Sequence, residues 1–241
     1  MINLIIADLR RILKKKGYYF MLLFMIIIAF FVCVSGSEIS VQDHIGRIHS
    51  FYQYVPIIFG SIPIFLGVFG DEMRTGSIQC VIGRGVSRTK VIVAKLIDCL
   101  VLTLIYYVVL LLVVYLFNYL SDIALSPRQN VMLAVFVALG VVKAMACYAF
   151  STIFLFTFWS VAAGIMSYLI YGTLLGLLLQ QAQTTVHLPF YDAFINGLLE
   201  NAYAAIDVGS FPFTLIPAIL VYIVLVTIIA AWLFKRKELD L

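Results

Sequence analysis

The sequence predicts an all-α polytopic membrane protein that crosses the bilayer six times. Of its 241 residues, 64% are hydrophobic and only 12% are charged, whereas ordinary soluble domains are about half apolar and about a quarter charged. The mean hydropathy is +1.10. A chain of 27.0 kDa has too little interior to shield that much apolar surface from water. These values exclude a soluble enzyme, a disordered chain and a nucleic-acid-binding module, and residues 1–241 are expected to form one transmembrane domain.

The number of spans follows from the uncharged stretches of the chain. A spanning helix needs about 20 mostly apolar residues. The longest stretch, 129–191, contains only one charged residue, Lys143, and is too long for a single helix. Two helices are therefore expected there, with a tight turn near Trp159 and Ser160. The six predicted spans are 18–36, 52–70, 97–118, 131–157, 161–180 and 213–234.

The positions of the basic residues support six spans and predict their orientation. Cytoplasmic loops carry the excess of Lys and Arg. Six spans place thirteen of the sixteen basic residues on one side, and leave Arg47 and Arg128 on the other side with six acidic residues. Five or seven spans would move the C-terminal basic cluster across the membrane. We therefore expect a multi-pass protein of the cell membrane, in a bacterium, with both termini in the cytoplasm.

Residues 1–16 are expected to form an amphipathic helix in the membrane interface. Isoleucine and leucine recur at intervals of three and four residues from Ile2 to Leu13, while Asp8 and the cations occupy the other face. Cations on such a helix lie among anionic lipid headgroups. The helix is either a simple topology anchor or an elbow that bends into the first span and transmits motion.

The cytoplasmic segment 71–95 contains a pattern that a topology loop does not need. A short apolar run, Ser77–Ile82, lies between Gly76 and Gly83 and is long enough for about one and a half turns of helix. Ser87 is placed to cap a helix that begins at Arg88. A loop that only fixes topology needs cations, whereas an exposed apolar turn indicates a contact with another protein.

The outer loop, 181–212, is too apolar to be a free hydrophilic loop. It has no Lys or Arg and is rich in aromatic and small residues. Helices that re-enter the outer leaflet would fit this composition, provided that they are buried against protein.

Two features of the spans are candidates for a cavity or a gate. Pro56, Gly60 and Pro63 predict a kink in span two, because proline removes a backbone donor; the kink is either a moving element or a static one. Lys143 is a charge at bilayer depth, which costs about 3 kcal/mol or more. It either faces a cavity or substrate, or it snorkels or binds backbone groups within the bundle.

Small residues in span five predict close helix packing. Gly164, Gly172 and Gly176 recur at multiples of four residues, and the last two form a GxxxG pair. This spacing lets two helices approach closely. The neighbouring helix belongs either to the same chain or to a second copy in a dimer.

Signatures of catalysis are absent from the sequence. It has no GxxxxGK[ST] phosphate loop and no GxGxxG, so the usual machinery of ATP hydrolysis is not expected here. The three histidines and four scattered cysteines do not suggest a metal site. Carboxylates near mid-membrane, which ion-coupled carriers use, are also missing. We therefore expect no bound cofactor or metal, and energy supplied by a partner.

In these features the chain resembles the permease subunit of type-2 ABC exporters, the group that includes bacitracin, lantibiotic-immunity and sodium-efflux transporters. In that family an acid leaves span two, a Gly-Ser/Thr pair follows, and Ser-Arg precedes a Lys that opens span three. The matching residues are Glu72, Gly76 with Ser77, Ser87 with Arg88, and Lys95. The family's pair is usually Gly-Thr, so Gly-Ser departs from it slightly.

The resemblance implies that Ser77–Ile82 is a coupling helix that docks on a separate ATPase, which binds ATP and Mg. The Trp159–Ser160 turn would be a second, smaller contact. It also implies two ATPase copies and a second permease chain, as a homodimer or a heterodimer. The ATPase-coupling residues it implies are Glu72, Gly76, Ser77, Ile78, Gln79, Cys80, Val81, Ile82 and Arg88.

The apolar, aromatic spans favour export of a hydrophobic or amphipathic cargo: a peptide antibiotic, a lipid or a drug. Two other functions remain open. One is a non-transporting membrane sensor or assembly subunit, and the other is an ATP-independent channel or carrier.

Overall fold

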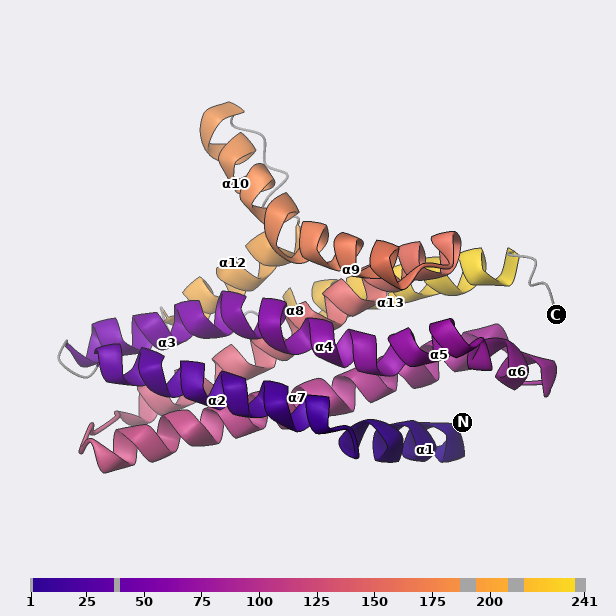
Figure 1. The fold of residues 1–241 in the computed structure, drawn as a ribbon. Coiled ribbons are helices and arrows are strands. Elements are labelled where there is room, and N and C mark those ends of the chain that lie inside the picture. The colour runs from indigo at the N-terminus through magenta and orange to yellow at the C-terminus, as the bar shows by residue number, and fades with distance from the viewer. Residues whose placement is uncertain (1, 37–39, 187–193, 208–214, 237–241) are drawn as a thin grey trace.

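Helices account for nearly all of the chain in the computed structural model, which describes residues 2–36, 40–186, 194–207 and 215–236 (Figure 1). These ranges contain no β-strand, so the all-α prediction is confirmed. The elements are α1 (Ile2–Leu13), α2 (Lys16–Gly36), α3 (Val41–Val55), η1 (Pro56–Ser61), α4 (Ile62–Phe65), η2 (Leu66–Gly70), α5 (Asp71–Thr75), α6 (Ser77–Gly83), α7 (Arg88–Leu120), α8 (Pro127–Phe158), α9 (Val161–Leu169), η3 (Ile170–Leu174), α10 (Leu175–Val186), α12 (Ile195–Asp207) and α13 (Leu215–Arg236).

Within the described ranges, five helical stretches are long and apolar enough to cross a membrane, as expected of a multi-pass membrane protein. They are Lys16–Ser35, Asp43–Thr75, Arg88–Leu120, Pro127–Phe158 and Val161–Thr185. A shorter apolar helix, Ile219–Lys235, lies within α13, where the sixth span was predicted.

Several helices extend well beyond the predicted spans. The 33 residues of α7 measure about 50 Å, while the hydrocarbon core is about 30 Å thick. Most of the segment between the first two predicted spans, 37–51, belongs to the helix α3. Ser40 caps this helix by accepting a hydrogen bond from Asp43 N at 3.3 Å. Charged residues defined most of the predicted span ends, but polar side chains do not end a helix that leaves the bilayer.

The second crossing departs from α-helical hydrogen bonding where prolines were predicted to kink it. Pro56 opens the π-helical segment η1, and a second π-helical segment, η2, follows α4. Proline frees backbone carbonyls, which in a membrane must find other donors. Tyr148 Oη donates to Ser61 O at 3.0 Å, and Tyr168 Oη donates to Ile57 O at 3.2 Å. Two tyrosines of neighbouring helices thus hydrogen-bond carbonyls of the irregular segment.

Span five, predicted as one helix over 161–180, is interrupted. The π-helical segment η3 separates α9 from α10, and the chain bends sharply there (Figure 1). Bends in helices arise at such segments and at glycine, and Gly172 lies within η3. The turn predicted before this span is present: Trp159 has φ 52°, and Ser160 Oγ accepts from Ala163 N at 3.4 Å.

The predicted outer loop, 181–212, is described in part. α10 continues to Val186, and α12 packs against α8 and α13. Residues 187–193 and 208–214 lie outside the described residues. Helical structure in this region agrees with its apolar composition, because unpaired backbone groups are costly away from water.

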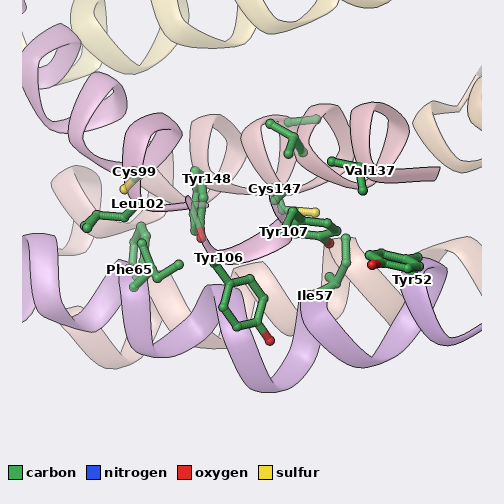
Figure 2. Packing of buried hydrophobic residues seen from close by; sticks show 14 of the residues in the cluster. Tyr52, Ile57, Phe65, Cys99, Leu102, Tyr106, Tyr107, Val137, Cys147 and Tyr148 are labelled. Atoms are coloured by element: carbon green, nitrogen blue, oxygen red, sulfur yellow. The ribbon is translucent and has the colours of Figure 1, made fainter. Parts of the chain in front are cut away.

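Tyrosines and phenylalanines of α3, α4, α7 and α8 form the middle of the core (Figure 2). Tyr106 and Tyr107 are both fully buried. A Cβ atom added at Gly60 would overlap the ring of Tyr106, so this position requires glycine for close helix approach. Gly60, a candidate above for a cavity or a gate, is thus a packing site.

Candidate functional site

The short helix α6 is set off from its neighbours by glycines. Gly76 has φ +66°, and it both ends α5 and begins α6. After the helix, Gly85 has φ +90°. This left-handed conformation is unfavourable for side chains with a Cβ atom, so Gly76 allows the sharp turn between the two helices. Seven residues, Ser77–Gly83, therefore form a separate helix between α5 and α7.

The side chains of α6 divide between an inner and an outer face. Ile78 is 0% exposed, and Val81 and Ile82 are partly buried against the core. Cys80 is exposed, and Ser77 and Gln79 are partly exposed. Ile78, which was expected to face a partner, is instead buried within the chain. A helix of two turns places residues 78, 81 and 82 on one face, so Val81 and Ile82 turn toward the core as well. A partner would contact the face that carries Gln79 and Cys80.

A buried ionic cluster lies at the base of this segment and joins three helices. Lys95 Nζ of α7 donates to Asp8 Oδ2 of α1 at 2.6 Å, and it also contacts Glu72 Oε1 of α5. Arg11 Nη2 of α1 donates to the same Glu72 oxygen at 2.7 Å. Lys95, Glu72 and Asp8 are 1%, 7% and 6% exposed. Charge-assisted hydrogen bonds of this kind are the strong ones.

The ionic cluster connects the two ends of the segment that contains α6. Glu72 precedes α6 in the chain and Lys95 follows it, so their contact ties the two ends of the segment together. A further pair, Lys15 with Asp71, connects the chain between α1 and α2 to α5. We call these three regions — α1, α5 and the start of α7 — the stem of α6. Ion pairs thereby connect the two helices that flank α6 to α1 and to the start of α2.

Several chain segments meet at this end of the bundle. α1, α6 and the C-terminal end of α13 lie at one end in Figure 1, and the last turn of α2 and the first turn of α3 lie at the other. Arg88 Nη1 donates to Phe234 O of α13 at 2.9 Å. Trp159, in the turn between α8 and α9, stacks on Phe234 with ring centroids 6.0 Å apart. Both predicted cytoplasmic contacts are thus at the end where α13 finishes.

Lys143 faces the interior of the bundle and is 4% exposed. Its Nζ donates to Gln53 O at 3.1 Å and lies 5.2 Å from the centre of the Tyr54 ring. Gln53 Nε2 in turn donates to Glu200 Oε1 at 3.1 Å. The alternatives left open by the sequence both apply, because the ammonium binds a backbone carbonyl and also lines a cavity.

Two small pockets adjoin Lys143. The first encloses about 30 Å³, room for one or two water molecules, and the second lies on the side of α10. Gln53, Lys143 and Glu200 line both pockets. Gly172 and Gly176 line only the second, which brings two of the predicted packing glycines to the buried lysine. Pro56, Gly60 and Pro63 line neither pocket.

The glycines of span five pack within the chain. A Cβ atom at Gly164 would lie 3.0 Å from the Phe65 ring, and one at Gly172 would lie 3.3 Å from Cys147 Sγ. Both are contacts with helices of the same chain. Gly176 is also buried.

The described residues contain no group of three His, Cys, Asp or Glu side chains that could hold a metal ion. The ionic cluster combines the acids Asp8 and Glu72 with Lys95 and Arg11. Glu72 and Lys95 belong to one sequence motif, but no local pattern indicates that Asp8 and Arg11 join them. No known protein family matches the chain, and no curated protein sequence matches it.

Proposed function

We propose that this chain is the transmembrane permease subunit of an ATP-driven ABC exporter. The observation that carries the proposal is α6: a separate helix with an exposed outer face, held by a buried ionic cluster between spans two and three. A segment that only fixed topology would need neither the helix nor the cluster. The resemblance of Glu72, Gly76, Ser77 and Lys95 to the family motif points to the same function.

In this proposal α13 is the sixth span and α1 is the elbow helix. The 22 residues of α13 measure about 33 Å, which is enough to cross the hydrocarbon core. The C-terminal end of α13 lies close to the start of α7, because Arg88 donates a hydrogen bond to the carbonyl oxygen of Phe234. An even number of spans would return the end of α13 to the side of the membrane where α1 begins. This agrees with Figure 1, in which α1, α6 and the end of α13 lie at one end of the bundle.

The ionic cluster gives the coupling step a physical path. Closure of the ATPase subunits would push α6, and the Glu72–Lys95 contact would carry the displacement into α5 and α7. The π-helical segments η1 and η2 would yield within span two, since they are common at functional sites and bend readily. Two copies of the chain, or this chain and a related one, would enclose the cargo path.

The spans suit an amphipathic cargo such as a peptide antibiotic, a lipid or a drug. Apolar side chains line most of the interior, and the pocket at Lys143 and Glu200 adds one cation and one anion. Ionisable groups inside a membrane commonly mark a substrate path.

Purification from native membranes tests the proposal. The tagged chain should co-elute with an ATPase that carries a phosphate loop, and cargo should stimulate its ATP hydrolysis. Vesicles that hold the complex should transport cargo only with ATP. Transport by the chain without the ATPase would indicate a carrier or channel, and an ATPase-free complex without transport would indicate a sensor or assembly subunit.

The cysteines of the native chain allow a direct test of topology. Cys80 is exposed and the other three cysteines are buried. An impermeant maleimide should therefore leave the wild-type chain unlabelled in intact cells and label Cys80 after permeabilisation. The variant Ser40→Cys, at an exposed position before α3, should be labelled in intact cells. Labelling of Cys80 in intact cells would contradict a cytoplasmic α6.

A further inference from the structure

A groove of about 320 Å³ lies between the start of α7 and the end of α13. Thr89 and Val93 of α7 line one wall, and residues 227, 231 and 235, one turn apart on α13, line the other. Ile228 and Trp232 complete the lining and are 57% and 49% exposed, so the groove lies on the outer surface of the bundle. Three of the lining residues are threonine or alanine, whose short side chains leave room between the two helices.

The two helices are fixed to each other at one end of the groove. Arg88 Nη1 donates to Phe234 O at 2.9 Å and to Lys235 O at 3.1 Å, and the guanidinium carbon lies 5.5 Å from the centre of the Phe234 ring. An arginine placed in this way satisfies the last carbonyl groups of a helix. The groove is therefore a defined feature beside the stem of α6, to which the start of α7 belongs.

The groove continues into an apolar stripe along α13. Leu220, Val224 and Ile228 recur at four-residue intervals on one helical face, and each is more than half exposed. Val224 and Lys235 are separated by about 16 Å of helix, close to half of the hydrocarbon thickness of about 30 Å. Trp232 lies near the charged end, where aromatic rings commonly meet lipid headgroups. If α13 is a span, as proposed above, the groove extends from the headgroups into one leaflet.

The charged end of the groove carries cations from both helices. Lys235 lines the groove, and the exposed Lys90 follows Thr89 on α7. Neither α13 nor the first ten residues of α7 contain an acidic residue. The tail after α13, which carries both signs of charge, lies outside the described residues. A ligand with an anionic head and an apolar body therefore complements the groove.

We propose that this groove binds one anionic phospholipid. Its acyl chain lies against Val93, Ala231 and the apolar stripe, and its phosphate meets Lys235, Lys90 and the Thr89 hydroxyl. A second copy of the same surface would place like charges against these lysines, which favours lipid over self-association. The proposal rests on α13 being a span and does not involve the ATPase.

Fluorescence quenching by brominated lipids tests the site, because Trp232 lies in it and the chain has only one other tryptophan, Trp159. Trp159→Phe leaves Trp232 as the sole fluorophore. In phosphatidylcholine vesicles, a small fraction of brominated phosphatidylglycerol should quench Trp232 more strongly than the same fraction of brominated phosphatidylcholine. Lys235→Gln should reduce this enrichment about fivefold, the equivalent of about 1 kcal/mol for one cation near a membrane surface.

Two further variants show whether the groove itself is required. Ala231→Leu fills the groove while keeping Lys235, so it should abolish the preference for phosphatidylglycerol. Lys14→Gln removes an exposed lysine after α1, at the same end of the bundle, and should leave the preference unchanged. If Trp159→Phe fails to fold, native mass spectrometry of the wild-type chain provides the test. Phosphatidylglycerol should then remain bound to the wild type and be lost from Lys235→Gln and Ala231→Leu.

Three results would overturn the proposal. Equal quenching by both lipids would show that the groove takes whichever lipid surrounds the protein. A preference that survives Ala231→Leu would show a general attraction to the basic end of the bundle. Protection of Trp232 from both lipids would show that the groove does not face the bilayer: quenching by aqueous iodide would then place α13 outside the membrane, and protection from iodide would show that protein covers the groove. Failure of the exporter proposal alone would change none of these measurements.

Discussion

Replacing Lys95 by methionine is expected to lower the free energy of unfolding by about 3–5 kcal/mol, the typical cost of removing one partner from a buried ion pair. Lys95 is 1% exposed and is the residue that contacts both Asp8 and Glu72. Without it, two buried acids would share Arg11 as their remaining cation in the cluster. Unfolding of the purified chain in detergent, followed by the loss of helical signal, measures the effect.

Two matched variants separate this effect from a general loss of charge. Lys90→Met removes an exposed lysine from the same helix and should change the stability by no more than about 0.5 kcal/mol. Adding Glu72→Gln to Lys95→Met should restore part of the loss, because one unpaired acid is removed. Equal stability of Lys95→Met and Lys90→Met would show that the cluster contributes little.

Truncation of Ile78 to alanine is expected to destabilise the chain itself by about 2–5 kcal/mol. Its side chain is fully buried beneath α6, so the substitution leaves a cavity between α6 and the core. Cys80→Ala, on the outer face of the same helix, should change the stability by no more than about 0.5 kcal/mol. Thermal unfolding of both variants checks the difference.

The roles of these two positions should also separate in assembly. Ile78→Ala should reduce the amount of folded chain, while the folded fraction still binds its partner. A bulky maleimide on Cys80 should leave the fold intact and weaken partner binding. Normal stability of Ile78→Ala would contradict the packing of α6 described above.

Much of the fold follows from hydrophobicity and from a few local signals. The long apolar stretches predicted the helices that are able to span, because residues exposed to lipid must be apolar. The break at Trp159 and Ser160 was predicted from length alone, and Ser160 caps the helix that follows. Gly76 marked the start of α6 because only glycine readily adopts the conformation found there.

Other features depend on contacts that no local pattern encodes. The interruption at η3 lies where this segment packs against α8 and where Gly172 approaches Cys147 closely. The inward orientation of Ile78 depends on which residues of other helices pack against α6, and the seven residues of α6 do not specify these. The ionic cluster joins residues up to 87 positions apart, Asp8 and Lys95, and sequence spacing gives no sign of such a pairing.

The most direct test of the exporter proposal is a photo-activated cross-link from native Cys80 in the membranes of the source organism. A short maleimide cross-linker should attach there, because the other three cysteines are buried. Illumination should then capture an ATPase with a GxxxxGK[ST] phosphate loop, and Cys80→Ala should abolish the product. Capture of only lipid or a second copy of this chain, in membranes that contain such an ATPase, would contradict the assignment of α6 as a coupling helix.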